Sequence, residues 1–298
     1  MGNRGGDLGG ADDDHAFALC RLPMASRARS GMKRTSFSDL WLGVVGSAVL
    51  MFLCLPVLIV APMSFSDAKS LEFPPAALSL RWYESLFGNP VWIEAGTNSL
   101  VLATLSSSIA LVCGTLAAYV LVRGDFRGKR LLEANFMAPM ILPSIITAVS
   151  LYIFFARIGL LGTFFGLVLG HTILAVPYVI LIMQAAFRSF DVRIEQVAAT
   201  LGASQLQILT RVVLPNMAPS AAAAWIFSFV MSFDEVVVTL FIAGTHMTIP
   251  KRMFNELVIQ INPTITAVAT LLIAFNILAL AALLLLTRRN RALREGMT

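Results

Sequence analysis

Long uncharged apolar runs alternate with short polar connections along most of the chain. A helix that crosses a bilayer needs roughly 20 consecutive, mainly apolar residues, and six stretches reach about that length. These stretches cover residues 40–63, 98–122, 132–155, 164–187, 219–244 and 264–287. The pattern therefore predicts an all-α integral membrane protein with six transmembrane helices.

Prolines and small residues recur inside these runs. Pro139 and Pro143 lie in the third run and Pro177 in the fourth. Such prolines are tolerated where neighbouring helices satisfy the freed carbonyls. The second run is rich in Ser, Gly and Ala, which allow close contact between helices. Both features fit a packed bundle, and neither identifies a function.

The composition supports a membrane protein. Of the 298 residues, 57% are hydrophobic and only 13% are charged, whereas soluble domains carry about 25% charged residues. The net charge of +5 could indicate a nucleic-acid partner, but the basic residues sit at the ends of the apolar runs. That placement indicates membrane topology, so no nucleic-acid partner is expected.

The distribution of Lys and Arg predicts the orientation. If both termini are cytoplasmic, 17 of the 22 basic residues lie inside. The five outside are Lys69, Arg81, Arg157, Lys251 and Arg252. By the positive-inside rule, both ends are therefore predicted to be cytoplasmic. We expect a disordered cytoplasmic tail over 1–38, the six-span domain over 39–290 and a cytoplasmic C-terminus over 291–298.

Residues 190–215, between the fourth and fifth runs, are too polar to span and too regular for an irregular loop. Asp191 is a favourable N-cap, and Gly202 is a natural helix stop. Apolar residues follow the N-cap at helical spacing: Ile194, Val197, Ala198 and Leu201. These signals predict a first short helix.

A second short helix is predicted directly afterwards. Ser204 and Gln207 have the spacing of a capping box, and the following residues are largely apolar until Pro215. The whole stretch reads as a helix–glycine–helix elbow at the cytoplasmic membrane face. A surface-lying linker helix without a dedicated partner is the alternative.

The elbow resembles the EAA loop of ABC importer permeases, E-A-A-x3-G-x9-I-x-L-P. The matching positions are Gln196, Val197, Ala198, Gly202, Val212, Leu214 and Pro215. Gln196, Val197 and Val212 depart from the pattern, so position 196 carries no carboxylate. Glu195, one position earlier, is the alternative acid.

Further segments are similar to the polyamine (spermidine/putrescine) branch of the MetI-like class of these permeases. They include HTILAVPYVI at 171–180, SFDEVVVTLFIAG at 232–244 and NPTITAVATLL at 262–272. The resemblance covers roughly residues 95–290 and is closest to the second of the two permeases of such systems. Opine and aminophosphonate importers share much of the pattern.

The resemblance implies a set of partners. These are an ABC ATPase dimer, a second permease subunit, an external solute-binding protein and the lipid bilayer of the bacterial inner membrane. In this family the short helix of the elbow inserts into a groove on the ATPase. The residues carried over to this coupling role are Glu195, Gln196, Ala198, Gly202, Leu214 and Pro215.

No enzyme site is visible in the sequence. Residues 124–130, GDFRGKR, lack the G-x4-G-K-[ST] spacing of a phosphate-binding loop, so we expect ATP hydrolysis on a separate subunit. His15, His171 and His246 are scattered, which gives no metal-ligand cluster. We expect no cofactor and no metal on this chain.

Asp234 and Glu235 lie side by side within the fifth apolar run. An acid at the centre of a membrane helix costs about 2.5–3.5 kcal/mol on insertion scales. On a continuous helix, Ser228, Ser232, Glu235 and Thr239 would share one face. Asp234 would fall about 100° away, in a column with Phe227, Met231, Val238 and Phe241.

We interpret the polar face as part of a substrate path. Its predicted members are Asp234, Glu235, Ser232, Ser228 and Thr239, with His171 of the fourth run as a further candidate. Intramembrane acids are functional candidates by default, and a carboxylate near aromatic rings suits an amine. The alternatives are incidental back-bonding of the hydroxyls, pairing with a cation, or a position in an outer vestibule.

The sequence thus predicts a permease subunit of an ATP-driven importer for a polyamine or related cationic amine. Another small solute of the same class, such as an opine or aminophosphonate, is the alternative. A gradient-driven secondary transporter is a third reading, which leaves the elbow unexplained.

Overall fold

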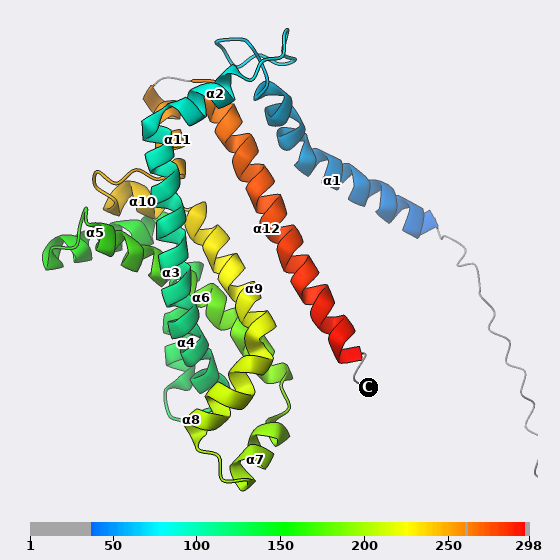
Figure 1. The fold of residues 1–298 in the computed structure, drawn as a ribbon, viewed down its shortest axis with the longest axis vertical. Coiled ribbons are helices and arrows are strands. Elements are labelled where there is room, and N and C mark those ends of the chain that lie inside the picture. Colours follow the sequence, from blue (N-terminus) through cyan, green and yellow to red (C-terminus); the bar gives the residue numbers. More distant parts are fainter. Residues whose placement is uncertain (1–36, 260–261, 296–298) are drawn as a thin grey trace, which may run out of the picture. The chain divides into compact units, whose positions relative to one another are not determined.

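The computed structural model describes residues 37–259 and 262–295, with side chains for 41–258 and 262–285. These residues are mostly helical and form no β-strand within the described ranges (Figure 1). The chain divides into two units, Met1–Leu53 and Cys54–Thr298. Each is considered by itself.

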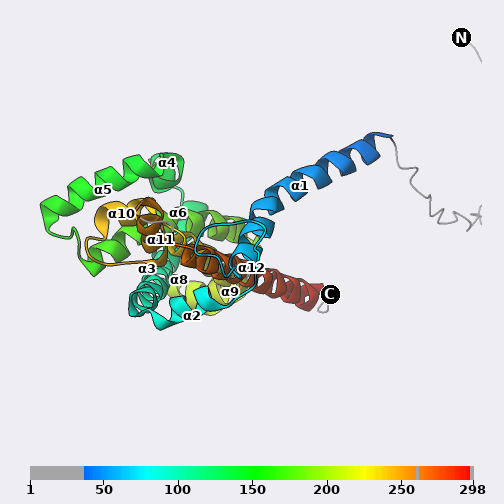
Figure 2. The same cartoon turned by 90° about the horizontal axis from the view of Figure 1, so that it is seen from above.

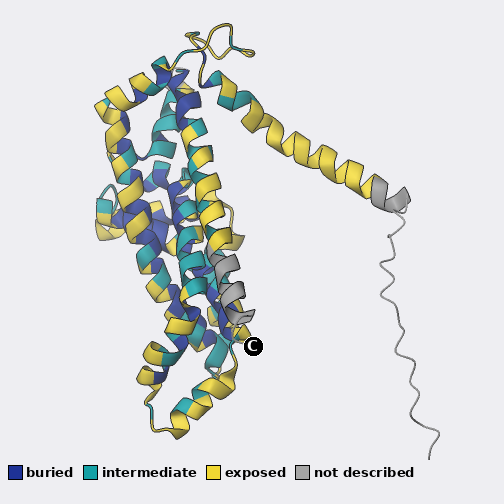
Figure 3. Cartoon of the chain, turned by 45° about the vertical axis from the view of Figure 1, so that its right-hand side comes forward, coloured by how far each residue is buried: buried dark blue, intermediate teal, exposed yellow. Residues whose placement is uncertain are grey.

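Helix α1, Phe37–Met63, begins in the first unit and ends in the second. Its segment Trp41–Met63 is long and apolar enough to cross a membrane, with a mean hydropathy of 2.7. Large apolar residues of α1 such as Leu42, Met51 and Phe52 are exposed, and Figure 3 colours most of the described part of this helix as exposed. The cytoplasmic tail predicted over 1–38 lies outside the described residues except for its last two, which belong to α1.

The second unit contains the remaining elements. These are α2 (Arg81–Gly88), α3 (Pro90–Arg123), α4 (Lys129–Ile141), α5 (Ser144–Ile158), α6 (Phe164–Ser189), α7 (Val192–Thr200), α8 (Gln205–Gln207), the π-helix η1 (Ile208–Val213), α9 (Leu214–Phe233), α10 (Val237–Ile242), α11 (Ile249–Ile259) and α12 (Thr264–Glu295). Within the described ranges, five helices are long and apolar enough to span a membrane, or six if α4 and α5 form one span. This confirms the all-α membrane fold.

Helices α3, α6 and α9 form the packed centre of this unit (Figures 1 and 3). The side of α3 that faces inward carries small residues that are almost fully buried: Ala95, Ser99, Ala103, Ser106, Ala110 and Ala118. Small side chains let helix backbones approach closely, as the sequence predicted. On the other side of α3, exposed Leu100, Val112 and Val120 are suited to contact with lipid.

The third predicted span is broken into two helices. α4 and α5 meet at an angle of 106°, and Figure 2 shows the sharp turn between them. Leu142, between the helices, has an extended backbone (φ −74°, ψ 143°). The ring of the following Pro143 disfavours helical geometry at Leu142, so the prediction of one helix over 132–155 was wrong at this point.

The fifth predicted span is also interrupted. α9 ends at Phe233, and α10 begins only at Val237. The two acids, Asp234 and Glu235, lie at this interruption, and the β-branched residues Val236, Val237 and Val238 that follow weaken a helix. The side chain of Glu235 also accepts a hydrogen bond from the Val238 N–H (2.9 Å), which favours a new helix start. The prediction of one helix over 219–244 was therefore wrong.

The first half of the elbow has the predicted geometry. Asp191 caps α7, because its Oδ1 accepts from the Arg193 N–H at 2.9 Å. Gly202 has φ +85°, which a residue without Cβ adopts readily. The Gly202 and Ala203 amides bond the carbonyls of Ala199 and Ala198, the pattern of a Schellman motif.

The second half of the elbow differs from the prediction at its end. The capping box of Ser204 and Gln207 is present, but helical structure continues from Gln205 to Phe233 rather than stopping at Pro215. The π-helix η1 lies directly before α9, and Pro215 lies in the first turn of α9. A π turn widens the helix, which accommodates a ring that would clash in a regular α-helix.

The close contact of α3 with α6 gives a stability prediction. A Cβ at Gly114 would lie 2.8 Å from the Val179 Cβ, whereas a Cβ at Gly96 in the same helix would meet only the Ile249 Cδ1 at 3.9 Å. We expect Gly114→Ala to lower the free energy of unfolding by about 1–3 kcal/mol through overpacking. Gly96→Ala is the matched control and should cause no loss.

Thermal unfolding of the detergent-purified protein measures both variants. Equal unfolding temperatures for Gly114→Ala and Gly96→Ala would contradict the close approach of α3 and α6.

Candidate functional site

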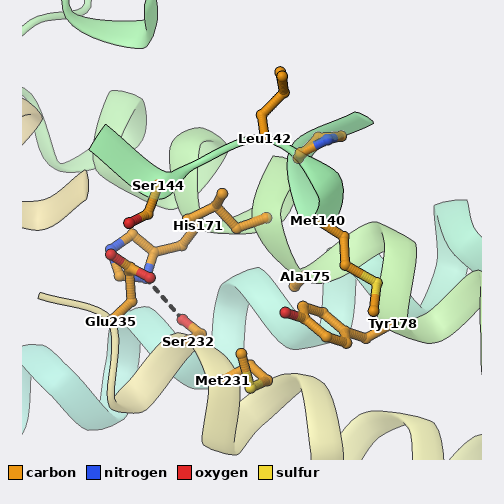
Figure 4. Close-up of a pocket in the computed structure, with 11 residues that line it drawn as sticks. Met140, Leu142, Ser144, His171, Ala175, Tyr178, Met231, Ser232 and Glu235 are labelled. Atoms are coloured by element: carbon orange, nitrogen blue, oxygen red, sulfur yellow. Dashed lines mark hydrogen bonds between the residues drawn. The ribbon is translucent and has the colours of Figure 1, made fainter. Parts of the chain in front are cut away.

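A pocket of about 230 Å³ lies where both helix breaks face α6 (Figure 4). Its lining comes from the α4–α5 break, from α6 and from the end of α9 and the residues after it. The lining residues are Pro139, Met140, Leu142, Ser144, His171, Leu174, Ala175, Tyr178, Met231, Ser232 and Glu235. Irregular backbone at membrane depth is tolerated where it is buried in protein or lines a water-filled cavity. The two breaks and the pocket therefore belong together.

His171 connects the two halves of the interrupted fifth span. Its Nδ1 lies 2.9 Å from the Ser232 Oγ in the last turn of α9, and its Nε2 lies 2.9 Å from the Thr239 Oγ1 in α10. The side chain is buried, with 1% of the residue exposed. A neutral imidazole donates at one nitrogen and accepts at the other, so it satisfies both hydroxyls.

Two further bonds extend this polar cluster. The Ser232 Oγ lies 2.8 Å from the Ser106 Oγ of α3, and the Thr239 hydroxyl donates to the Glu235 carbonyl at 2.9 Å. We call Ser106, His171, Ser232 and Thr239 the histidine cluster. It joins α3, α6, α9 and α10 around the segment that carries Glu235, so it fixes where that carboxylate lies.

Glu235 presents a carboxylate to the pocket. Its Oε1 is held by the Val238 amide, and no described side chain bonds its Oε2. The lining contains no Lys or Arg and no second carboxylate. A pocket with an acid and no basic counterpart is suited to a cation, which can approach Oε2.

Asp234 faces a different environment. It is exposed, and its Oδ2 accepts from the Asn276 Nδ2 of α12 at 3.0 Å. It does not line the pocket. The two adjacent acids thus face different surroundings: Glu235 lines the pocket, and Asp234 bonds Asn276 of α12.

The predicted aromatic column is only half correct. Phe227 and Met231 precede Asp234 along α9 with helical spacing and are 41% and 36% exposed. Val238 and Phe241 instead pack with Leu102, Phe155 and other residues of a separate apolar cluster. Since α9 ends before Asp234, the column cannot continue into α10.

The predicted polar face is likewise interrupted, yet most of it converges. Ser232, Glu235 and Thr239 meet around His171 through the contacts described above. Ser228 is fully buried, but its hydroxyl donates to the Trp225 carbonyl at 3.0 Å and lies outside the pocket lining. The structure brings together four of the six predicted path residues.

The predicted coupling acid, Glu195, is engaged within the chain. Its Oε1 pairs with the Arg123 Nη2 at 2.6 Å and accepts from the Arg123 Nε at 2.9 Å. Its Oε2 accepts from the Tyr119 hydroxyl at 3.3 Å. The bonded carboxylate therefore anchors α7 to the end of α3.

The other predicted coupling residues are spread along the elbow. Gln196 is exposed on α7, whereas Ala198 packs against the apolar core. Gly202 forms the turn, and Leu214 and Pro215 open α9. Between them, apolar Val197, Leu201 and Leu206 are 58%, 83% and 70% exposed, so the elbow presents an apolar surface.

Sequence reasoning missed the contribution of the third span and the partner of Glu195. Met140 and Ser144 line the pocket because the chain breaks at Pro143, and the prolines of that run were the available signal. Arg123 was counted only for topology; nothing in its sequence context indicates a pairing with a residue 72 positions later. The described residues contain no group of three or more His, Cys, Asp or Glu that could hold a metal ion.

Comparison with known proteins gives consistent relatives. The spermidine/putrescine transport system permease protein PotC of Haemophilus influenzae is 33% identical over 244 residues, which cover 81% of this chain and 94% of PotC. The putrescine transport system permease protein PotI of Escherichia coli is 31% identical over 80% of this chain and 88% of PotI. The molybdate/tungstate permease WtpB of Pyrococcus abyssi is 29% identical over 71% and 82%.

Solved structures share the fold. A bacterial ABC transporter that imports alginate aligns with a TM-score of 0.64 at 17% identity, over 83% of this chain and 96% of that one. The MetNI methionine ABC transporter aligns with a TM-score of 0.51 at 18% identity, over 72% and 98%. The family model for the binding-protein-dependent transport system inner membrane component matches residues 110–292. This chain belongs to that family of ABC importer permeases.

Proposed function

We propose that this permease forms, with a second permease subunit, the path for a polyamine or related cationic amine. An ATPase dimer drives the transport, and an external solute-binding protein delivers the substrate. The observation that carries the proposal is the Glu235 carboxylate, which faces a pocket lined by no basic side chain. The relatives named as spermidine and putrescine permeases support the same substrate class.

The charge of the pocket argues against other solutes of the class. WtpB is named for oxyanions, and an oxyanion next to an unpaired carboxylate is repelled. Opines and aminophosphonates carry acidic groups that need a basic partner, and the described lining offers none. The aromatic ring of Tyr178 lies in the same pocket (Figure 4), and such a ring can bind an ammonium group through cation–π attraction.

The second carboxylate extends the path. Asp234 is exposed beside Phe227 and Met231, and Met231 also lines the pocket. We propose that this exposed stripe of α9 faces the second permease, so that Asp234 and Glu235 act as successive weak sites for a cation. Ser228 supports the helix that carries them.

The elbow couples this path to ATP. Its apolar surface, formed by Val197, Leu201 and Leu206, offers buried area to an ATPase groove. With both termini in the cytoplasm of a bacterium, the elbow lies on the side where ATP is available. ATP binding then switches the pocket from outside to inside access, whereas a gradient-driven transporter would leave this surface without a role.

Glu235→Gln tests the role of charge in the pocket. The amide oxygen can still accept from the Val238 N–H, so the local fold is kept while the negative charge is lost. A hydrogen bond to a charged group is worth about 1.5–3 kcal/mol, so we expect spermidine uptake at low concentration to fall by about 10- to 100-fold. Uptake of radiolabelled spermidine by the reconstituted complex measures this.

Glu94→Gln, at an exposed acid of α3 outside the pocket, is the matched control and should leave uptake unchanged. Asp234→Asn should cause a smaller loss than Glu235→Gln. Unchanged uptake in the double variant Asp234→Asn/Glu235→Gln would rule out the anionic path.

Substitutions of His171 test how Glu235 is positioned. Asn can imitate Nδ1 and keep the bond to Ser232, Gln can imitate Nε2 and keep the bond to Thr239, and Ala keeps neither. Because an unsatisfied buried polar group costs about 1–3 kcal/mol, His171→Ala should unfold at the lowest temperature of the three. Spermidine uptake should likewise be lowest in His171→Ala.

Thermal unfolding and uptake are measured on the same preparations. A His171→Ala protein with unchanged stability and unchanged uptake would contradict the positioning role.

A further inference from the structure

The ion pair between Arg123 and Glu195 is unusually well supported for the rim of a helix bundle. Arg123 bonds Glu195 through both Nη2 and Nε and also donates to the Phe190 carbonyl at 3.2 Å. The two side chains are only 20% and 11% exposed. Planar guanidinium groups with several bonds to one carboxylate hold a defined geometry.

A second ion pair of the second unit provides a contrast. Arg188 and Glu133 lie 3.9 Å apart with side chains 66% and 37% exposed. Such exposed pairs contribute little. The Arg123–Glu195 pair is therefore a structural link, whereas the Arg188–Glu133 pair is not.

The elbow is connected to the pocket along three helices. Two connections are covalent: α6 carries His171 and ends at Ser189, just before α7, and helical structure from Gln205 to Phe233 carries Ser232 near its end. The third is α3, which carries Arg123 at its last residue and Ser106 within its length. Arg123 lies 17 positions after Ser106, which corresponds to about 26 Å of helix, and Ser106 meets Ser232 at 2.8 Å.

α7 follows α6 after Phe190 and Asp191, and its Ala198 packs against the apolar core. α7 joins the rest of the elbow through the turn at Gly202, and glycine turns are natural pivots. Among the described residues, the pair with Arg123 is the ion pair that α7 makes with the bundle. Without it, a displacement of α7 could be absorbed at the turn before it reaches α9.

We propose that the Arg123–Glu195 pair transmits displacement of the elbow through α3 to the histidine cluster and the Glu235 pocket. Arg123 and Glu195 are positioning residues, because they touch neither ATP nor substrate. The inference rests on the proposed function for the identity of the ATPase-driven motion. It adds that α3 and α9, which are in contact through Ser106 and Ser232, move together when the elbow is displaced.

The experiment uses the complete transporter with Cys20, Cys54 and Cys113 replaced by Ser and with Met231→Cys as a reporter in the pocket. The rate of thiol labelling is compared in ADP and in ATP with orthovanadate, and ATP hydrolysis is measured in parallel. We expect the two nucleotide states to differ roughly tenfold in labelling rate, within the usual range of allosteric coupling. Arg123→Gln and Glu195→Gln should remove most of that difference while ATP hydrolysis continues.

The reversed pair, Arg123→Glu with Glu195→Arg, should restore the nucleotide dependence, which a purely local role of either residue would not produce. Arg123→Lys keeps the charge and should give an intermediate response if Arg123→Gln fails to fold. Arg188→Gln is the matched control at the exposed pair and should behave like the reporter protein.

Full nucleotide dependence in folded Arg123→Gln or Arg123→Lys would overturn the inference, and so would its absence in the reporter protein or its equal loss in Arg188→Gln. The labelling readout needs no transported substrate. A reporter protein that shows the ATP-dependent change but takes up no spermidine would therefore refute the proposed substrate and leave the linkage intact.

Discussion

The structure depends on one constraint: inside a bilayer, backbone N–H and C=O groups must find partners within the protein. Continuous helices meet it locally. The two interruptions of this chain, at Leu142–Pro143 and between Phe233 and Val237, meet it differently. Both line the pocket beside α6, and at the second interruption the side chains of Glu235 and Thr239 bond the backbone. The polar pocket is therefore found where the two helices are interrupted.

The sequence predicts the helical membrane fold and the elbow well, because both depend on local signals. Apolar length sets the spans, and Asp191, Gly202 and Ser204 set the caps. The interruption after Phe233 is different. Asp234 and Glu235 mark that position in the sequence, but two acids alone do not predict a helix end. The bond from the Val238 N–H to the Glu235 side chain, which favours a new helix start, becomes visible only in three dimensions.

The candidate site shows the same division. Ser232, Glu235, Thr239 and His171 were predicted individually, although the continuous helix assumed for three of them does not exist. Their convergence depends on His171 bridging two short helices, which periodicity cannot reveal. Arg123 and Glu195 lie far apart in the sequence, so a single sequence offers no signal of their pairing. The sequence therefore indicates individual polar residues of the site, but it does not indicate which distant residues contact one another.

The pocket lining contains one carboxylate, that of Glu235, and this limits how much positive charge of a bound substrate it can balance. Under the proposed function, the substrate carries more than one ammonium group along a flexible chain, and the single carboxylate of the pocket neutralises one of them. Electroneutrality in a low-dielectric passage requires further negative charge at the spacing of the remaining ammonium groups. Asp234 lies on another face of the same subunit. Under the proposed function, Glu235 and Asp234 supply two negative charges from this subunit, and any further ones come from the second permease.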